Sequence, residues 1–154
     1  MTGPAARGTY ILLAELASAT TIMVGKLGEI PFAAGVYAYI GSALGPGGLD
    51  ARLGRYAAGP GRKHWHIDYF LEYAEIFGTL TRAGNERREC GWSSWVGARV
   101  SSCIVGFGSS DCVCKGHLYL VGDHDQSEDL ATFAKYELKA TPKIGSRWIS
   151  PGAR

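Results

Sequence analysis

Residues 35–56, GVYAYIGSALGPGGLDARLGRY, combine tyrosines on an apolar segment with a glycine-rich segment and a basic segment. Arg52 and Tyr56 are four residues apart, so in a helix their side chains lie on the same face. A hydrophobic core needs neither the glycines nor the positive charge. A site that handles phosphate can use both, together with the tyrosine hydroxyls, so this stretch predicts phosphate chemistry.

The sequence HWHID, which begins at His64, is a second candidate for chemistry. His64 and His66 alternate and therefore share one side of an extended chain. With Asp68 they can bind phosphate, assist proton transfer or add metal ligands, and we favour His66 and Asp68. The alternative is that Trp65 and Ile67 pack while the polar side chains brace the segment through hydrogen bonds.

The cysteines allow two interpretations. Cys112, Cys114 and His117 form a C-x-C-x-x-H pattern that, with Cys90, would supply four ligands for tetrahedral Zn²⁺. Against this, C-x-C is tighter than the usual two-residue spacing, and free cysteines are common core residues. Because the chain shows no export signal, we expect reduced thiols rather than disulfides.

Apolar runs and turn residues predict one α+β domain in which a sheet positions these groups. We expect strands over residues 8–16, 20–25, 36–40, 75–81, 103–105 and 117–121. We expect helices over 49–58, from Asn85 to about 99 and from Ser127 onward, with a short helical turn over 63–71. The first three strands have short connections, which favours an antiparallel meander. In the last helix Leu130, Phe133 and Leu138 are expected on the buried side.

Composition limits the classes of function. The chain has 154 residues, of which 46% are hydrophobic and 19% charged, as in globular domains. It contains no apolar run of membrane-spanning length, and the first residues do not resemble a signal peptide, so we expect a cytoplasmic protein. The net charge of +2 is nearly neutral, so any affinity for DNA must come from a local patch. Arg55, Arg62 and Lys63 are the candidates for contacts with the DNA backbone.

Six short motifs follow one another along the chain: GTY (8–10), GVYAYIGSA (35–43), GGLDARLGRY (47–56), HWHIDYFL (64–71), EC (89–90) and GFGSSDCVCKGHL (106–118). Over about residues 8–121 the chain therefore resembles the GIY-YIG nuclease superfamily. The resemblance is to a small bacterial and archaeal branch once filed as a domain of unknown function and sometimes fused to endonuclease III-type glycosylases. GVY at 35–37 is too close to YIG for a separate strand, so we assign the first motif to GTY and Tyr10, which places a long hairpin between the motifs.

The resemblance implies a fold and a set of site residues. The fold is a small central antiparallel sheet flanked by helices, in a single domain over 1–154 with a core at about 8–121 and a C-terminal helix and tail at 122–154. The implied catalytic residues are Tyr10, Tyr39, Arg52, Tyr56 and Glu89. The residues His64, His66 and Asp68 are possible accessories.

Each implied role suits its residue type. The planar guanidinium of Arg52 can bind two phosphate oxygens. One tyrosine would orient or deprotonate water, and the other would hold a metal-bound water or the scissile phosphate. A tyrosine base needs a pKa lowered from about 10, which a metal or Arg52 would supply. Glu89 matches the carboxylate that binds Mg²⁺, or Mn²⁺, in the family.

These expectations combine into a metal-dependent nuclease that hydrolyses DNA phosphodiester bonds in DNA repair. The first alternative is a non-catalytic nucleic-acid-binding module that keeps the phosphate cradle. The second is a zinc-bearing partner domain for a base-excision repair glycosylase. The expected partners are accordingly DNA and such a glycosylase, and no membrane.

Overall fold

Eight strands and four α-helices make up the described part of the chain, which comprises residues 6–59, 61–100, 102–109 and 114–143 of a computed structural model. The strands are β1 (Gly8–Leu16), β2 (Thr20–Met23), β3 (Glu29–Phe32), β4 (Gly35–Ala43), β5 (Glu75–Ala83), β6 (Ser102–Cys103), β7 (Leu118–Gly122) and β8 (Thr141–Lys143). The helices are α1 (Gly48–Ala57), α2 (His66–Phe70), α3 (Glu89–Gly97) and α4 (His124–Glu137), with a 3₁₀ turn η1 (Gly25–Leu27). The predicted α+β class is confirmed.

The main sheet has the strand order β6-β7-β4-β1-β5-β8, and all its described pairs are antiparallel. The predicted meander is wrong, because β1 pairs directly with β4 whereas β2 pairs with β3 in a separate hairpin. The error arose in residues 25–35, which have the composition of a turn but contain β3. The hairpin inserted between the two tyrosine motifs is present.

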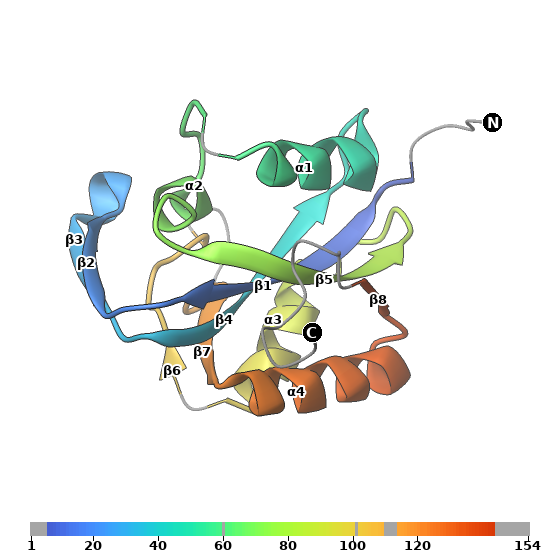
Figure 1. Ribbon diagram of the computed structural model, residues 1–154. Helices are drawn as coiled ribbons and strands as arrows, with labels where there is room; N and C mark the ends of the chain where they lie inside the picture. Colours follow the sequence, from blue (N-terminus) through green and yellow to red (C-terminus); the bar gives the residue numbers. More distant parts are fainter. Residues whose placement is uncertain (1–5, 60, 101, 110–113, 144–154) are drawn as a thin grey trace.

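Helices cover both faces of the sheet, with α1 and α2 on one side and α3 and α4 on the other (Figure 1). Alternate side chains of β1 explain this arrangement, because successive residues of a strand point to opposite faces. Tyr10 and Leu12 join the cluster that includes residues of α1 and α2. Ile11 and Leu13 join the cluster that includes residues of α3 and α4. The central strand is therefore buried on both faces and fixes the position of Tyr10.

Both predicted N-caps are wrong. Residues 84–88 form a loop in which Arg88 pairs with Glu86, so α3 begins only at Glu89 and not near Asn85. The cap of α4 is Asp123, whose side chain accepts a hydrogen bond from the backbone N–H of Gln126. At 14 residues, α4 is the longest described helix, and none of the described helices is long and apolar enough to cross a membrane.

The buried face of α4 also differs from the predicted one, because the helix begins before Ser127. Ser127, predicted as its cap, is instead a buried residue inside the helix and donates a hydrogen bond to the carbonyl of His124. Ser127, Leu130 and Ala134 form the buried stripe. Phe133 lies beside that stripe and is 51% exposed, contrary to expectation, whereas Leu138 packs against the cluster as a partly buried residue.

The glycine of the YIG sequence has a steric role. Gly41 lies opposite Tyr10 in the β1–β4 register, and a Cβ added to it would overlap the hydroxyl and ring of Tyr10. Gly41→Ala is therefore expected to displace Tyr10 and to lower the free energy of unfolding by about 1–3 kcal/mol, the usual cost of overpacking. Urea denaturation measures this cost. Gly54→Ala in α1 is the control, because its Cβ would meet nothing within 4 Å. Equal stability of Gly41→Ala and the wild type would contradict the steric role.

Candidate functional site

A cavity of about 470 Å³ lies between the end of β4 and the helices α1, α2 and α3. It brings together four of the predicted catalytic residues and two of the predicted accessory residues, namely Tyr10, Tyr39, Arg52, Glu89, His64 and His66. Gly41, Ser42, Leu44, Trp65, Arg87 and Gly108 complete the lining. Segments that are far apart in the sequence therefore deliver hydroxyl, guanidinium, carboxylate and imidazole groups to one concave surface.

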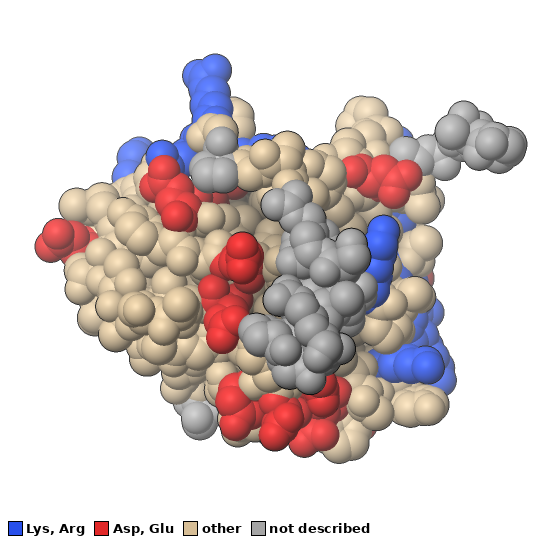
Figure 2. All heavy atoms as spheres, in the orientation of Figure 1, with Lys and Arg blue, Asp and Glu red and all other residues tan. Residues whose placement is uncertain are grey.

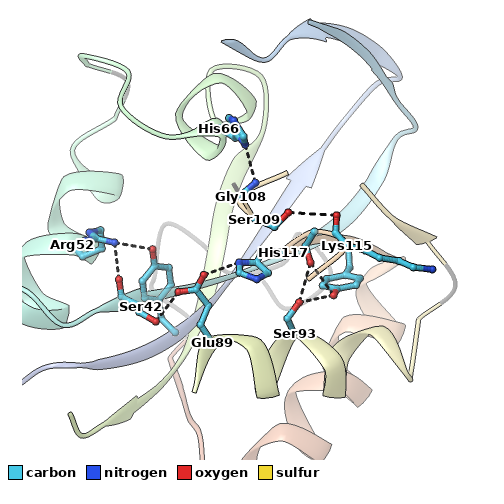
Figure 3. Close-up of polar contacts among 12 residues, drawn as sticks. Ser42, Arg52, His66, Glu89, Ser93, Gly108, Ser109, Lys115 and His117 are labelled. Atoms are coloured by element: carbon cyan, nitrogen blue, oxygen red, sulfur yellow. Dashed lines mark hydrogen bonds and ion pairs between the residues drawn. The ribbon is translucent and has the colours of Figure 1, made fainter. Parts of the chain in front are cut away.

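Arg52 is held in place by three neighbours. Its Nη1 donates a hydrogen bond of 2.8 Å to the carbonyl oxygen of Ser42 and approaches the hydroxyl of Tyr10 at 3.4 Å (Figure 3). Its guanidinium carbon lies 4.4 Å from the centre of the Trp65 ring. These contacts fix a permanently charged, planar donor at the edge of the cavity, where a phosphate can accept hydrogen bonds from it.

The predicted pairing of Arg52 and Tyr56 on one face of α1 is present, since both contact Tyr10. The hydroxyls of Tyr10 and Tyr56 are 2.9 Å apart and form a hydrogen bond. Tyr37, the tyrosine of the rejected GVY motif, lies instead in the core against Phe32 and Phe70. The geometry therefore favours the assignment of the first motif to Tyr10.

Arg52 alone does not lower the pKa of the site tyrosines below the usual value of a phenol. Burial raises the pKa of Tyr10, Tyr39 and Tyr56, and the positive charge of Arg52 lowers each of them by less than burial raises it. Burial favours the neutral form of a phenol because the phenolate loses its hydration. At neutral pH these hydroxyls are therefore protonated and can donate hydrogen bonds to a phosphate or orient a water.

Glu89 is the carboxylate of the cavity, and both its oxygens have partners. Ser42 Oγ donates a hydrogen bond of 2.8 Å to Oε1, and Nδ1 of His117 lies 2.7 Å from Oε2 (Figure 3). Burial raises the pKa of Glu89, but the contacts with His117 and Ser42 and the charge of Arg87 outweigh burial, so the net pKa lies below its usual value. Glu89 is therefore ionised at neutral pH.

His66 faces the cavity with a defined tautomer. Its Nδ1 accepts a hydrogen bond of 2.8 Å from the backbone N–H of Gly108 (Figure 3). Burial lowers the pKa of His66, so the neutral ring is favoured and carries its proton on Nε2. The Phe107 ring packs against the imidazole at a centroid distance of 5.6 Å. His66 can thus donate a hydrogen bond through Nε2.

Asp68 does not line this cavity. Its contacts are those of the alternative role described above, in which the polar side chains of this segment brace it through hydrogen bonds. Its carboxylate accepts two hydrogen bonds of 2.8 Å from Arg55. It also accepts hydrogen bonds from the backbone N–H groups of His64, at 2.7 Å, and Trp65, at 2.9 Å. These bonds fix the start of α2 and, with it, the position of His66. These contacts fit the bracing alternative, and the site role favoured for Asp68 stays a prediction.

The brace leads to a stability prediction. Asp68→Asn keeps the size of the side chain but removes the charge that Arg55 meets, so it should lower the free energy of unfolding at pH 7 by about 1–3 kcal/mol. The folded-state pKa of Asp68 is depressed by hydrogen bonds from Arg55, Trp65 and His64, which together outweigh the effect of burial. Its contribution is therefore present above the unfolded pKa of about 3.9 and is lost as the pH falls through the lower folded value.

Urea denaturation at pH 7 and again below pH 4 tests this prediction, because the difference between Asp68→Asn and the wild type should shrink in acid. Asp129→Asn, on the exposed side of α4, is the matched control and should change little. A loss of stability that is the same at both pH values would rule out the charged brace.

The predicted DNA-backbone residues are only in part available to a ligand. Arg55 is paired with Asp68, and Lys63 lies 2.9 Å from Glu72. Arg62 is exposed. Figure 2 shows basic side chains that project at the loop between α1 and α2, a second basic group beside the right-hand end of α4, and acidic side chains that gather along α4. Of the three predicted residues, the exposed Arg62 is the one for which no ion pair is described, and it is the most accessible to a phosphate backbone.

Sequence reasoning missed three residues of the site. Trp65 lies beside two cations, with the guanidinium carbons of Arg52 and Arg55 at 4.4 and 4.6 Å from its ring centre. Ser42 links Arg52 to Glu89 through its carbonyl and its hydroxyl. Arg87 contributes positive charge to the same cavity. Ser42 and Trp65 stand inside motifs that were recognised, and that position was the available signal.

Three of the four predicted zinc ligands come together beside the cavity. The ligand atoms of Cys90, Cys114 and His117 all lie within 4.8 Å of one another. Cys112, the fourth, lies outside the described residues. Cys103 belongs to β6 and is not a member of this cluster.

Comparison with protein families matches residues 9–139 to a model described as "Domain of unknown function DUF123". No curated protein and no solved structure matches the chain. The matched range contains every residue that lines the cavity, together with the thiol cluster.

Proposed function

The chain belongs to the DUF123 family, a domain of unknown function, and we propose that it is a GIY-YIG-type, metal-dependent nuclease that cleaves DNA phosphodiester bonds in DNA repair. One observation carries the proposal: Tyr10, Tyr39, Arg52 and Glu89, which were selected from separate motifs, line a single cavity. A cation, hydroxyl donors and an ionised carboxylate are the groups that phosphodiester hydrolysis requires.

In this proposal Arg52 binds the scissile phosphate. Its position is fixed by Ser42 and Trp65, so little reorganisation is needed when negative charge grows on the phosphate. The neutral hydroxyls of Tyr10 and Tyr39 and the Nε2–H of His66 add hydrogen-bond donors around the same space. Because their pKa values are raised, the tyrosines orient a water or a phosphate oxygen instead of acting as bases.

The donor set at Glu89 fits a hard divalent cation. Mg²⁺ is commonly held by one or two carboxylates, with waters and substrate phosphates filling its other positions. Glu89 is ionised and lines the cavity beside Arg52. A bound Mg²⁺ or Mn²⁺ would supply a water of lowered pKa and offset phosphate charge. Ser42 and His117 hold the carboxylate in orientation for that task.

A nicking assay tests the proposal. The full chain is incubated with supercoiled plasmid and with plain, abasic and branched DNA duplexes, in Mg²⁺, in Mn²⁺ and in excess chelator. We expect cleavage of at least one substrate that requires the divalent cation. Failure to cut any of them in either metal, by protein that is folded by circular dichroism, would overturn the nuclease proposal.

The second candidate is a non-catalytic module that binds nucleic acid, alone or beside a base-excision repair glycosylase. The geometry of the cavity favours it as well, because Arg52 and the neutral hydroxyls of Tyr10 and Tyr39 can bind a phosphate without cleaving it. Metal-independent DNA binding without cleavage would identify this function. Fluorescence anisotropy on the substrates of the nicking assay measures that binding.

A further inference from the structure

We propose that Cys90, Cys114 and His117 form a zinc site next to the carboxylate of Glu89. Their ligand atoms lie within 4.8 Å of one another. Ligands around a tetrahedral Zn²⁺ with two Zn–S bonds and one Zn–N bond are roughly 3.5–4 Å apart, so a small closure of the cluster would fill three of the four coordination positions of the ion. Two thiolates and an imidazole form a soft set that favours zinc over magnesium.

The three ligands come from two segments that are brought together by the fold. Cys90 is the second residue of α3, whereas Cys114 and His117 precede β7. The backbone N–H of His117 donates to the carbonyl of Phe107 at 2.7 Å, and its carbonyl accepts from Ile40 at 2.9 Å. The histidine is therefore anchored to β4 before any metal binds. An arrangement prepared in this way reduces the cost of ordering the ligands.

Glu89 supplies the interaction that orients a zinc-binding histidine. Metal-ligating histidines usually donate the other ring N–H to a carboxylate or carbonyl, which fixes the tautomer and raises the basicity of the ligating nitrogen. Nδ1 of His117 lies 2.7 Å from Oε2 of Glu89, which leaves Nε2 as the ring atom for the metal. His117 is fully buried, so this orientation is protected from water.

The zinc site would connect to the cavity through one side chain. Glu89 contacts His117 through Oε2 and Ser42 through Oε1, and Ser42 in turn accepts a hydrogen bond from Arg52 at its carbonyl (Figure 3). A metal that fixes His117 therefore also fixes the carboxylate of the cavity. The zinc proposal itself does not depend on nuclease activity, and its test measures metal content and spectra.

The experiment uses the full chain, purified under reducing conditions from a zinc-supplemented culture. We expect one zinc ion per chain by elemental analysis after dialysis against a weak chelator. Replacement of zinc by Co²⁺ should give the visible bands of tetrahedral cobalt and a thiolate-to-cobalt charge-transfer band. Removal of the metal by a strong chelator should lower the melting temperature.

Single substitutions separate ligands from neighbouring thiols. Cys90→Ser, at an exposed position, should keep the fold and lose both the zinc and the charge-transfer intensity that its thiolate provides. Cys103→Ser is the matched control, because this half-buried thiol is outside the cluster and should retain one zinc ion. The proposal is overturned if reduced wild type holds no zinc and gives no thiolate–cobalt band. Equal loss of zinc in Cys103→Ser and Cys90→Ser would also overturn it.

Discussion

Arg52→Ala is expected to reduce the rate of DNA cleavage at saturating DNA by about a hundredfold or more, which corresponds to roughly 3 kcal/mol of transition-state stabilisation. The reason is that negative charge on the phosphate grows in the transition state, and Arg52 is a cation fixed at the edge of the cavity. The loss should therefore appear in turnover more than in DNA affinity. Single-turnover cleavage at fixed Mg²⁺ measures it.

The surroundings of Arg52 also affect the stability of this variant. Arg52 is half-buried, hydrogen-bonded to Ser42 and packed on Trp65. Some loss of stability is therefore expected, and the assay must be run well below the melting temperature of the variant. Arg52→Lys supplies a second test, because lysine keeps the charge but loses the planar fork.

A matched control comes from the same basic region. Arg62→Ala removes an exposed arginine outside the cavity, so it should weaken DNA binding and flatten its salt dependence with little effect on the rate of the bound complex. If Arg52→Ala cuts as fast as the wild type once DNA is saturating, Arg52 is a binding residue only. That result would favour the non-catalytic module.

The central strands could be predicted because each of them is a run of apolar residues that is visible in the local sequence. The apolar run GTYILLAEL coincides with β1, and the helix over α1 was predicted to within one residue at each end. The pairing of the strands was harder to predict, because a strand can pair with a partner that is distant in the sequence. Residues 25–35 have the glycine-rich composition of a turn, yet they contain β3, which is stabilised by pairing with β2. The short strand β8 likewise exists through its contacts with β5.

The candidate site shows the same division. The motifs that carry the family resemblance were sufficient to select Tyr10, Tyr39, Arg52 and Glu89, which line one cavity. They were insufficient for the electrostatics, because the pKa of a tyrosine depends on how deeply the fold buries it. In the HWHID stretch, His66 lines the cavity, whereas Asp68 pairs with Arg55 outside it. The local sequence does not indicate which of the two side chains points into the cavity.

Glu89 takes part in both of the proposed metal sites. One of its oxygens contacts the buried His117 of the thiol cluster, and the residue also lines the cavity beside Arg52. A zinc ion bound to His117 would hold the carboxylate in place without occupying the cavity. The cavity would then remain open for the hard cation that the cleavage reaction requires. Substitutions at Glu89 must accordingly be assayed for both metals.

Glu89→Gln is expected to reduce Mg²⁺-dependent cleavage by about a hundredfold or more, because a neutral amide is a poor ligand for a hard cation and several kcal/mol of charge stabilisation are lost with the ion. DNA affinity in chelator should be unchanged or slightly higher, since a negative charge near the phosphate is removed. The pKa of Glu89 lies below its usual value, so its carboxylate stays ionised into mild acid, and the loss of activity that is due to protonation of Glu89 is expected only as the pH drops through that lowered value. Cleavage rates across a Mg²⁺ titration and a pH series measure both effects.

Glu86→Gln is the control for this variant, because Glu86 lies three residues upstream, is exposed and pairs with Arg88 outside the cavity. Zinc content measured on the same preparations separates the two metals, since loss of the carboxylate that orients His117 should weaken zinc binding about 10–100-fold. Cleavage that falls while one zinc per chain is retained assigns the defect to the Mg²⁺ site. Cleavage by Glu89→Gln at the wild-type rate in the same Mg²⁺ would show that Glu89 holds no catalytic cation, and the nuclease proposal would then lack its metal site.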